Sequence, residues 1–427
     1  MRTINVHALG PSGSGKTVFM AAMYRQLRIK RADADFYLKT DYATSVHMNS
    51  VFNAVANPQD EWPASTRVAN EWEFGLTVTT PAGDFEPLKM KYVDYPGLIL
   101  TAPRAAEDER YQHVIEQLKS AHALLVLLDG AGVLACLRGE PHGRRFLDFE
   151  LSSSLEIVQQ TRCPVHFAVT KWDLLEGAHS LAEVRDLLLG DGSFRDLIRG
   201  RSESAAGPIR LIPVSSVGTG FAAMQPNGQM QKLGPPARPF QVELPLISVI
   251  PDFVTYAFSE LQARDQDLLS RVQRHLRNAE SGGDLSGRYA GRLAMARDLT
   301  KRALASRLAK SLKATNPVLA ALLHDEDQFA DGLFFVVQEV ARRAAALTDK
   351  RQAADSAAAA SLRAGVHDQL SALQLIESQF HQRLARFEQK YPESLLAGPQ
   401  VAGFGHDDLD GGLLGDSWAM PAMGGMR

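Results

Sequence analysis

The segment from Gly10 to Thr17 has the spacing G-x-x-x-x-G-K-[ST], which constrains the fold of this chain more than any other feature. It follows an alternating apolar run at residues 3–9 and precedes an apolar segment, residues 18–23, that suits a helix. In such a strand–loop–helix unit, backbone N–H groups and the positive end of the helix face the same phosphate group. The motif predicts a nucleoside triphosphate site, with Lys16 at the β- and γ-phosphates and Thr17 on Mg²⁺.

A second segment, from Thr170 to Asp173, closes the apolar run at residues 164–169. A carboxylate at this point can accept hydrogen bonds from both N1–H and the 2-amino group of guanine, whereas adenine offers no such pair of donors. A site built on these bonds rejects a base that leaves them unmade. Asp173 therefore predicts guanine, and we expect the stem of Lys171 to lie along the face of the base.

Two weaker signals complete the pattern. Asp94 closes another expected strand, and Gly97 follows three residues later. This spacing fits a carboxylate on the Mg²⁺ side and a backbone N–H for the γ-phosphate. Further along, the apolar run at residues 209–214 leads into Ser215 and Ser216, which are placed like a serine loop behind the guanine ring.

These four signals, in this order and each at the carboxyl end of an expected strand, resemble the GTPase signature of the TRAFAC class of P-loop proteins. The resemblance spans about residues 1–220 and implies a Ras-like domain that binds GTP or GDP with Mg²⁺. The nucleotide-binding residues that it implies are Gly10, Ser12, Gly13, Ser14, Gly15, Lys16, Thr17, Val18, Asp94, Gly97, Thr170, Lys171, Asp173, Ser215 and Ser216.

Two departures from the Ras-like pattern bear on mechanism. Thr170 stands where asparagine is usual, a substitution also found in dynamin-like GTPases, and we expect it to weaken the tether between the base loop and the phosphate loop. Leu98 stands where Ras-like enzymes carry the glutamine that orients the attacking water. Leucine cannot hydrogen-bond a water, and rates without a positioned water and an arginine are far below one per second. We therefore expect slow hydrolysis unless another residue or a partner positions the water.

The remaining Mg²⁺ ligand is expected just before the strand at residues 71–79. Thr66 is the candidate, with Thr77 a weaker alternative inside the strand, and Arg67 is a candidate arginine finger in cis. Thr66 as a turn residue and Arg67 as a solvated charge remain open alternatives. The predicted Mg²⁺ ligands are thus Thr17, Thr66 and Asp94, and the predicted catalytic residues are Lys16, Thr66, Arg67 and Gly97.

Apolar periodicity predicts a P-loop NTPase fold, a three-layer α/β/α arrangement around a mainly parallel sheet. The pair at 71–79 and 88–93, joined by a turn at 81–84, is expected to be antiparallel. The predicted strands lie near residues 3–9, 71–79, 88–93, 123–128, 164–169 and 209–214. The predicted helices follow Thr17 and lie near residues 41–56, 105–121, 143–160 and 181–198.

The chain of 427 residues exceeds a single hydrophobic core, so we expect more than one domain. Residues 1–250 form the predicted GTPase domain, residues 251–396 an all-α region, and residues 397–427 a Gly-rich tail without fixed structure. The all-α region is predicted to contain helices at 252–281, 287–314, 317–348 and 352–391. A basic segment, residues 288–313, is either a solvated helix face or a surface for anionic membrane or an acidic partner.

Composition narrows the functional classes. A net charge of −3 gives no general bias toward nucleic acid or anionic membrane, and no nucleic-acid partner is expected. Cys136 and Cys163 lack metal-ligand spacing, which predicts reduced thiols. No apolar run is long enough to cross a bilayer, and the sequence leads directly into the first strand, so we expect a cytoplasmic protein.

Three functions compete. The first is a regulatory GTPase that hydrolyses GTP slowly and signals through the helical region to a protein partner or a second copy of itself. It loosely resembles bacterial GTPases encoded with multi-protein defence or signalling systems. The second is a dynamin-like, membrane-associated GTPase, which Thr170 and the basic segment favour, although the helical region is short for a stalk. The third, an ATP-dependent kinase or motor, is disfavoured by Asp173. We favour the first.

Overall fold

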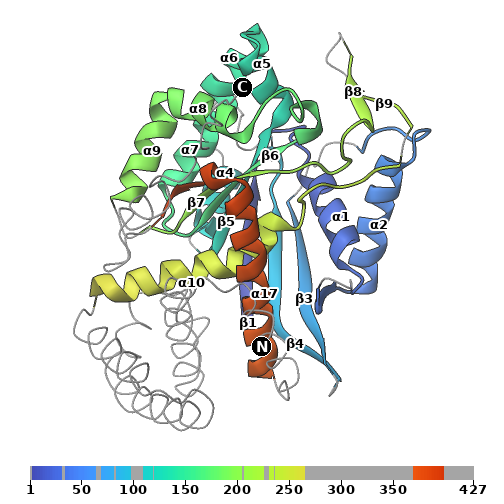
Figure 1. The fold of residues 1–427 in the computed structure, drawn as a ribbon, viewed down its shortest axis with the longest axis vertical. Coiled ribbons are helices and arrows are strands. Elements are labelled where there is room, and N and C mark those ends of the chain that lie inside the picture. The colour runs from blue at the N-terminus through green and yellow to red at the C-terminus, as the bar shows by residue number, and fades with distance from the viewer. Residues whose placement is uncertain are drawn as a thin grey trace, which may run out of the picture.

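The computed structural model describes residues 2–30, 34–63, 69–80, 83–97, 109–118, 120–203, 206–225, 230–234, 236–264 and 369–398. Within these residues an eight-stranded sheet has the order β10-β7-β6-β5-β1-β4-β3-β2 (Figure 1). Its strands are β1 (Arg2–Leu9), β2 (Phe36–Lys39), β3 (Asn70–Thr80), β4 (Gly83–Asp94), β5 (Ala123–Asp129), β6 (Val165–Thr170), β7 (Ile209–Pro213) and β10 (Leu395–Ala397). A separate hairpin pairs β8 (Ala222–Met224) with β9 (Met230–Lys232).

The middle of the sheet is parallel, as the sequence predicts. β1 runs parallel to both β4 and β5, and β5, β6 and β7 continue in the same direction. The predicted antiparallel hairpin is confirmed as β3 and β4, with Thr80 opposite Gly83. All the predicted strands are therefore present. The two edge strands, β2 and β10, were not predicted from the sequence, and both are antiparallel to their neighbours.

The predicted helices that fall on described residues are confirmed, with two corrections. The helix expected to begin at residue 252 begins at Leu244. The helices expected at 287–314 and 317–348 lie outside the described residues. The segment expected as a single helix at 181–198 is divided at Asp191, whose extended backbone ends one helix and whose side chain accepts a hydrogen bond from Phe194 N to begin the next. A helix that the sequence did not predict, α5, begins after Asp129. The helices are α1 (Lys16–Leu27), α2 (Tyr42–Ala56), α4 (Glu109–Leu118), α5 (Gly130–Leu137), α6 (Pro141–Arg145), a π-helical turn (Phe146–Leu151), α7 (Ser152–Gln159), α8 (Leu181–Gly190), α9 (Gly192–Ser202), α10 (Leu244–Arg264) and α17 (Gln369–Lys390).

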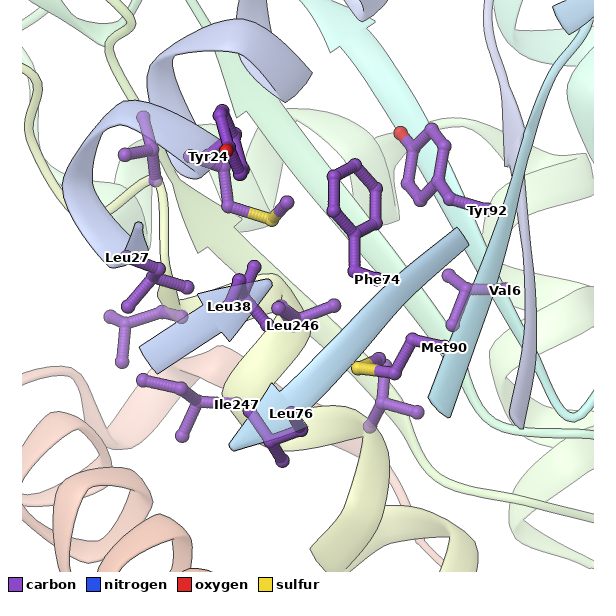
Figure 2. Close-up of a cluster of buried hydrophobic side chains, with 14 of the residues drawn as sticks. Val6, Tyr24, Leu27, Leu38, Phe74, Leu76, Met90, Tyr92, Leu246 and Ile247 are labelled. Carbon is purple, nitrogen blue, oxygen red and sulfur yellow. The ribbon is translucent and has the colours of Figure 1, made fainter. Parts of the chain in front are cut away.

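Two hydrophobic cores lie on opposite faces of the sheet, because successive strand side chains alternate between the faces. In β5, Leu125 and Leu127 join the core that contains α1, α10 and α17, whereas Leu124 and Val126 join the core that contains α4, α7 and α9. Figure 2 shows part of the first core, where residues of β3 and β4 meet α1 and α10. The fold is therefore the predicted three-layer α/β/α arrangement.

The described ends of the expected helical region pack on the sheet rather than away from it. α10 and α17 cross on the face that also carries α1 (Figure 1), and β10 is the last strand of the sheet. Residues 265–368, which include the basic segment, and residues 399–427 lie outside the described part of the chain. The division at residue 250 stays a prediction. Among the described helices, none combines the length and apolar character needed to cross a membrane.

Candidate functional site

A cavity of about 260 Å³ lies where the loops after β1, β4, β6 and β7 come together. These are carboxyl ends of parallel strands, the edge where ligands bind in open α/β sheets. The cavity is lined by Ser12, Gly13, Gly15, Lys16, Thr17, Val18, Trp62, Pro63, Gly97, Lys171, Asp173, Ser216, Val217 and Met230. All four sequence signals thus contribute residues to one cavity.

The loop after β1 has the backbone conformation that its glycines permit. Gly13 and Gly15 have φ values of 84° and 86°, in the region that side chains with a Cβ avoid. Gly15 is also the residue from which α1 begins, so the first N–H groups of the helix face the cavity. Ser14 is buried and donates from Oγ to Pro11 O at 2.9 Å, which closes the loop on itself. This geometry suits an anion at the start of α1.

Lys16 brings a positive charge into this loop. Its Nζ donates to the carbonyl oxygens of Gly10 at 2.7 Å and of Pro11 at 3.0 Å, and the residue is 6% exposed. Burial lowers the pKa of Lys16, and the nearby Asp94 carboxylate acts in the opposite direction. Because carbonyl dipoles compensate the buried ammonium only in part, an anionic ligand at this point gains a strong electrostatic partner.

Thr17 and Asp94 form the oxygen pair that the sequence assigns to Mg²⁺. Thr17 Oγ1 donates to Asp94 Oδ2 at 2.9 Å, and Asp94 is fully buried at the end of β4. A hydroxyl and a carboxylate are hard donors of the kind that Mg²⁺ takes, usually together with waters and phosphate oxygens. The residues present therefore fit the ion.

Gly97 contacts the phosphate loop directly. A Cβ built on this residue would lie 2.2 Å from Ser12 N and 2.4 Å from Pro11 C, so the position accepts no side chain. The loop after β4 and the loop after β1 are thus in backbone contact beside the cavity. Leu98 lies outside the described residues.

Thr170 joins the loop after β6 to the phosphate loop. Its Oγ1 lies 2.8 Å from Ser14 O and 3.0 Å from Leu128 O, and the residue is buried. The tether that the sequence analysis expected to be weakened by threonine is therefore formed, through a hydroxyl donor. Thr170 supports the cavity from behind and is not part of its lining.

Lys171 lines the cavity, and its ammonium group is paired with a carboxylate. Its backbone is left-handed, with φ 50°, and its Nζ lies 2.9 Å from Asp129 Oδ2. Asp129 also accepts a hydrogen bond from Ala131 N at the start of α5. An ammonium fixed at one end leaves the apolar stem of Lys171 as a flat surface toward the cavity. Asp129 was not predicted as a site residue, because it belongs to no recognisable motif.

Asp173 has one satisfied and one unsatisfied oxygen. Its Oδ1 accepts from Ser215 Oγ at 2.5 Å, whereas its buried Oδ2 has no hydrogen-bond partner among the described residues. Burial raises the pKa of Asp173, and the hydrogen bond from Ser215 acts against this shift. Ser215 is itself fixed, because its Oγ accepts from Gly218 N at 2.8 Å. A buried carboxylate oxygen without a donor is costly, and a ligand with N–H groups would satisfy it.

Some of the other predicted residues line the cavity and some do not. Ser216 lines it, whereas Gly10 and Ser215 do not. Thr77 is buried within β3. Thr66 and Arg67 lie outside the described residues, so their roles stay predictions. Four lining residues were not predicted from the sequence, namely Trp62, Pro63, Val217 and Met230. Only Trp62 and Pro63 had a signal, since they directly precede the segment that contains Thr66.

Comparison with known proteins adds little beyond this geometry. No protein-family model matches the chain, and no curated protein matches it. Among solved structures, the chain is similar to one in the signal recognition particle receptor SRb-GTP/SRX complex from Chaetomium thermophilum. The two are 18% identical with a TM-score of 0.33, and the match covers 52% of this chain and 94% of that chain.

Proposed function

We propose that this chain binds GTP and GDP, with Mg²⁺, and hydrolyses GTP slowly as a regulatory switch. The observation that carries the proposal is that one cavity holds two kinds of group. Lys16 and the start of α1 line it, and so does Asp173, whose buried Oδ2 has no hydrogen-bond partner among the described residues. A guanine nucleotide has the matching groups, since its phosphates suit the lysine and the start of the helix, and its N1–H and 2-amino donors suit the carboxylate.

The residues have separate tasks in this function. Lys16 and the N–H groups of residues 13–17 would hold the phosphates, and Thr17 and Asp94 would hold Mg²⁺, which neutralises phosphate charge when bound. Gly97 would offer its N–H to the γ-phosphate beside the phosphate loop. The stem of Lys171 would lie against the base while Asp173 accepts its two donors.

Slow hydrolysis follows from the chemistry of residue 98. Leucine has no group to hydrogen-bond an attacking water, so this position contributes no positioning to the reaction. Thr66 and Arg67 remain our candidates for the third Mg²⁺ ligand and for a charge that stabilises the transition state. A partner that supplies the missing group would accelerate the reaction, which is the behaviour of a switch.

We also propose that the helical region passes the nucleotide state to a protein partner. A buried charge network supports this route. Arg210 of β7 bonds to Asp252 of α10 through Nε at 2.5 Å and Nη2 at 2.6 Å, and to Glu388 of α17 at 2.6 Å. His166 of β6 lies 2.8 Å from the same Asp252 carboxylate. The strands that carry the base-contacting loops are thus bonded to both described helices of this region.

The test is titration of fluorescent GTP and ATP onto the purified protein with Mg²⁺, followed by single-turnover hydrolysis. We expect GTP-selective binding and turnover far below one per second. Asp173→Asn should exchange guanine for xanthine preference, because the amide can donate to the 2-carbonyl that xanthine has in place of the amino group. Asp148→Asn, an exposed change, is the matched control. ATP preference, or no binding, would contradict the proposal.

A further inference from the structure

The roof of the cavity is made by two segments that are distant in the sequence. Trp62 Nε1 donates to Met230 O at 2.7 Å, across 168 positions of the chain, and both residues line the cavity. Trp62 follows α2, and Met230 begins β9 of the small hairpin. Figure 1 shows this hairpin beside α2, at one end of the molecule and apart from the main sheet.

Lys232 holds the two segments together. Its Nζ donates to the carbonyl oxygens of Ala54 at 2.6 Å, Asn57 at 2.9 Å and Asp60 at 2.9 Å. The same ammonium lies 4.9 Å from the centre of the Trp62 ring. The last turn of α2 has no basic residue, so its carbonyl groups gain their cation from β9. One side chain therefore fixes the end of α2, the following turn and the Trp62 ring.

Apolar packing joins this contact to the base-contacting loop. The Trp62 ring meets Phe221 edge-on, with 6.4 Å between ring centroids. Phe221 is buried in a small cluster with Val55 of α2 and Val217, which is two residues beyond Ser215. The roof and the loop that fixes Asp173 are thus joined by side-chain packing.

We propose that Trp62 and the β8–β9 hairpin, held by Lys232, form a clasp that contacts the bound nucleotide and slows its release. This inference rests on the proposed function, because it takes a guanine nucleotide as the ligand under the clasp. The nucleotide can leave in two ways. Either the hydrogen bonds of Trp62 and Lys232 break and the clasp opens, or the nucleotide leaves slowly while the clasp stays closed. Trp62 is followed by Pro63, which also lines the cavity, and then by the segment that contains Thr66. The clasp therefore lies between the loop at Ser215 and that segment.

The experiment measures dissociation and association of GDP carrying a fluorescent N-methylanthraniloyl group, in the full chain with Mg²⁺. Lys232→Met keeps the apolar stem but removes the charge and all three hydrogen bonds, and we expect about tenfold faster dissociation. Trp62→Phe keeps a ring but removes the donor to Met230, and we expect about threefold faster dissociation. Association rates should change little, so the Kd rises with the dissociation rate.

Lys39→Met is the matched control, because Lys39 Nζ also lies over an aromatic ring, that of Tyr37 at 5.2 Å, but in β2. Its dissociation rate should equal that of the wild type.

Unchanged dissociation in both clasp variants, with GTP-selective binding in the wild type, overturns the clasp and leaves the proposed function standing. An equal rise in both rates, with the Kd unchanged, overturns the contact with nucleotide. No binding by the wild type overturns both proposals. Circular dichroism checks that each variant is folded, and Trp62→Phe provides the test if Lys232→Met is not.

Discussion

The floor of the cavity consists of the loops that follow β1, β4, β6 and β7, whereas its roof consists of Trp62 and the β8–β9 hairpin. The floor loops follow directly from strands of one sheet, and the hydrogen bond from Thr170 to Ser14 joins the loops after β6 and β1. The roof depends on contacts between α2 and a hairpin that is not part of that sheet.

This difference has a physical consequence. The floor is held by a parallel sheet that is packed on both faces, so its geometry is expected to persist without ligand. The roof is held by the hydrogen bond that Trp62 donates to Met230 O, by the bonds of Lys232 and by a small apolar cluster. Local opening is favoured where few buried contacts hold a segment. The floor should therefore determine which ligand binds, and the roof how long it stays.

The largest expected effect comes from breaking the buried ion pair that joins β7, which supports the floor, to α10. Burial raises the pKa of Asp252, but Arg210 and His166 outweigh this and hold it well below its usual range. Asp252→Asn removes the charge between these two buried partners, and we expect a loss of about 3–5 kcal/mol in the free energy of unfolding. Urea denaturation measures this loss.

The control for this variant is Asp186→Asn, since Asp186 is exposed and pairs with its neighbour Arg185. We expect at most about 0.5 kcal/mol there. A loss for Asp252→Asn as small as that of the control would show that the network under β6 and β7 does not hold the floor. The nucleotide affinity should fall together with the stability, because the two loops that we propose contact the base follow β6 and β7.

The second largest expected effect is on nucleotide affinity, and it comes from Lys16 in the loop after β1. Lys16→Ala removes the ammonium that we propose binds the phosphates, and we expect GTP and GDP to bind at least about 100-fold more weakly. The free energy of unfolding should not fall, because the variant also removes a buried charge whose pKa burial lowers. Calorimetric titration measures the affinity, with Lys39→Ala as the exposed control. Affinity within threefold of the wild type would contradict the assignment of this loop.

The floor could be predicted from the sequence because each part is a short motif after a strand. The spacing from Gly10 to Thr17 and the carboxylate at Asp173 depend on local chemistry and on the rule that parallel strands end at one edge. The strands themselves were recognisable because both-face burial gives continuous apolar runs, as in residues 123–128.

The roof and the sheet edges could not be predicted in this way. Met230 lies in a segment rich in Gly, Pro and Gln that has no apolar periodicity. Its place in the roof follows only from its hydrogen bond with Trp62. β10 has three residues and is defined by its pairing with β7, not by its composition. Asp129 and Lys232 act through bonds to residues far away in the sequence, and such bonds leave no pattern along the chain.

The smallest expected effect tests the tether inside the floor. Thr170→Val keeps the shape of the side chain but removes the hydroxyl, whose single hydrogen is shared between Ser14 O and Leu128 O. We expect a loss of about 1 kcal/mol in GTP binding, or roughly fivefold in Kd, because the base loop is no longer bonded to the phosphate loop. Thr161→Val, which removes a 3.0 Å bond to Val158 O away from the cavity, should leave the Kd unchanged. Equal GTP affinity in Thr170→Val and wild type would mean that sheet packing alone aligns the two loops, and that the threonine adds nothing to the rigidity of the floor.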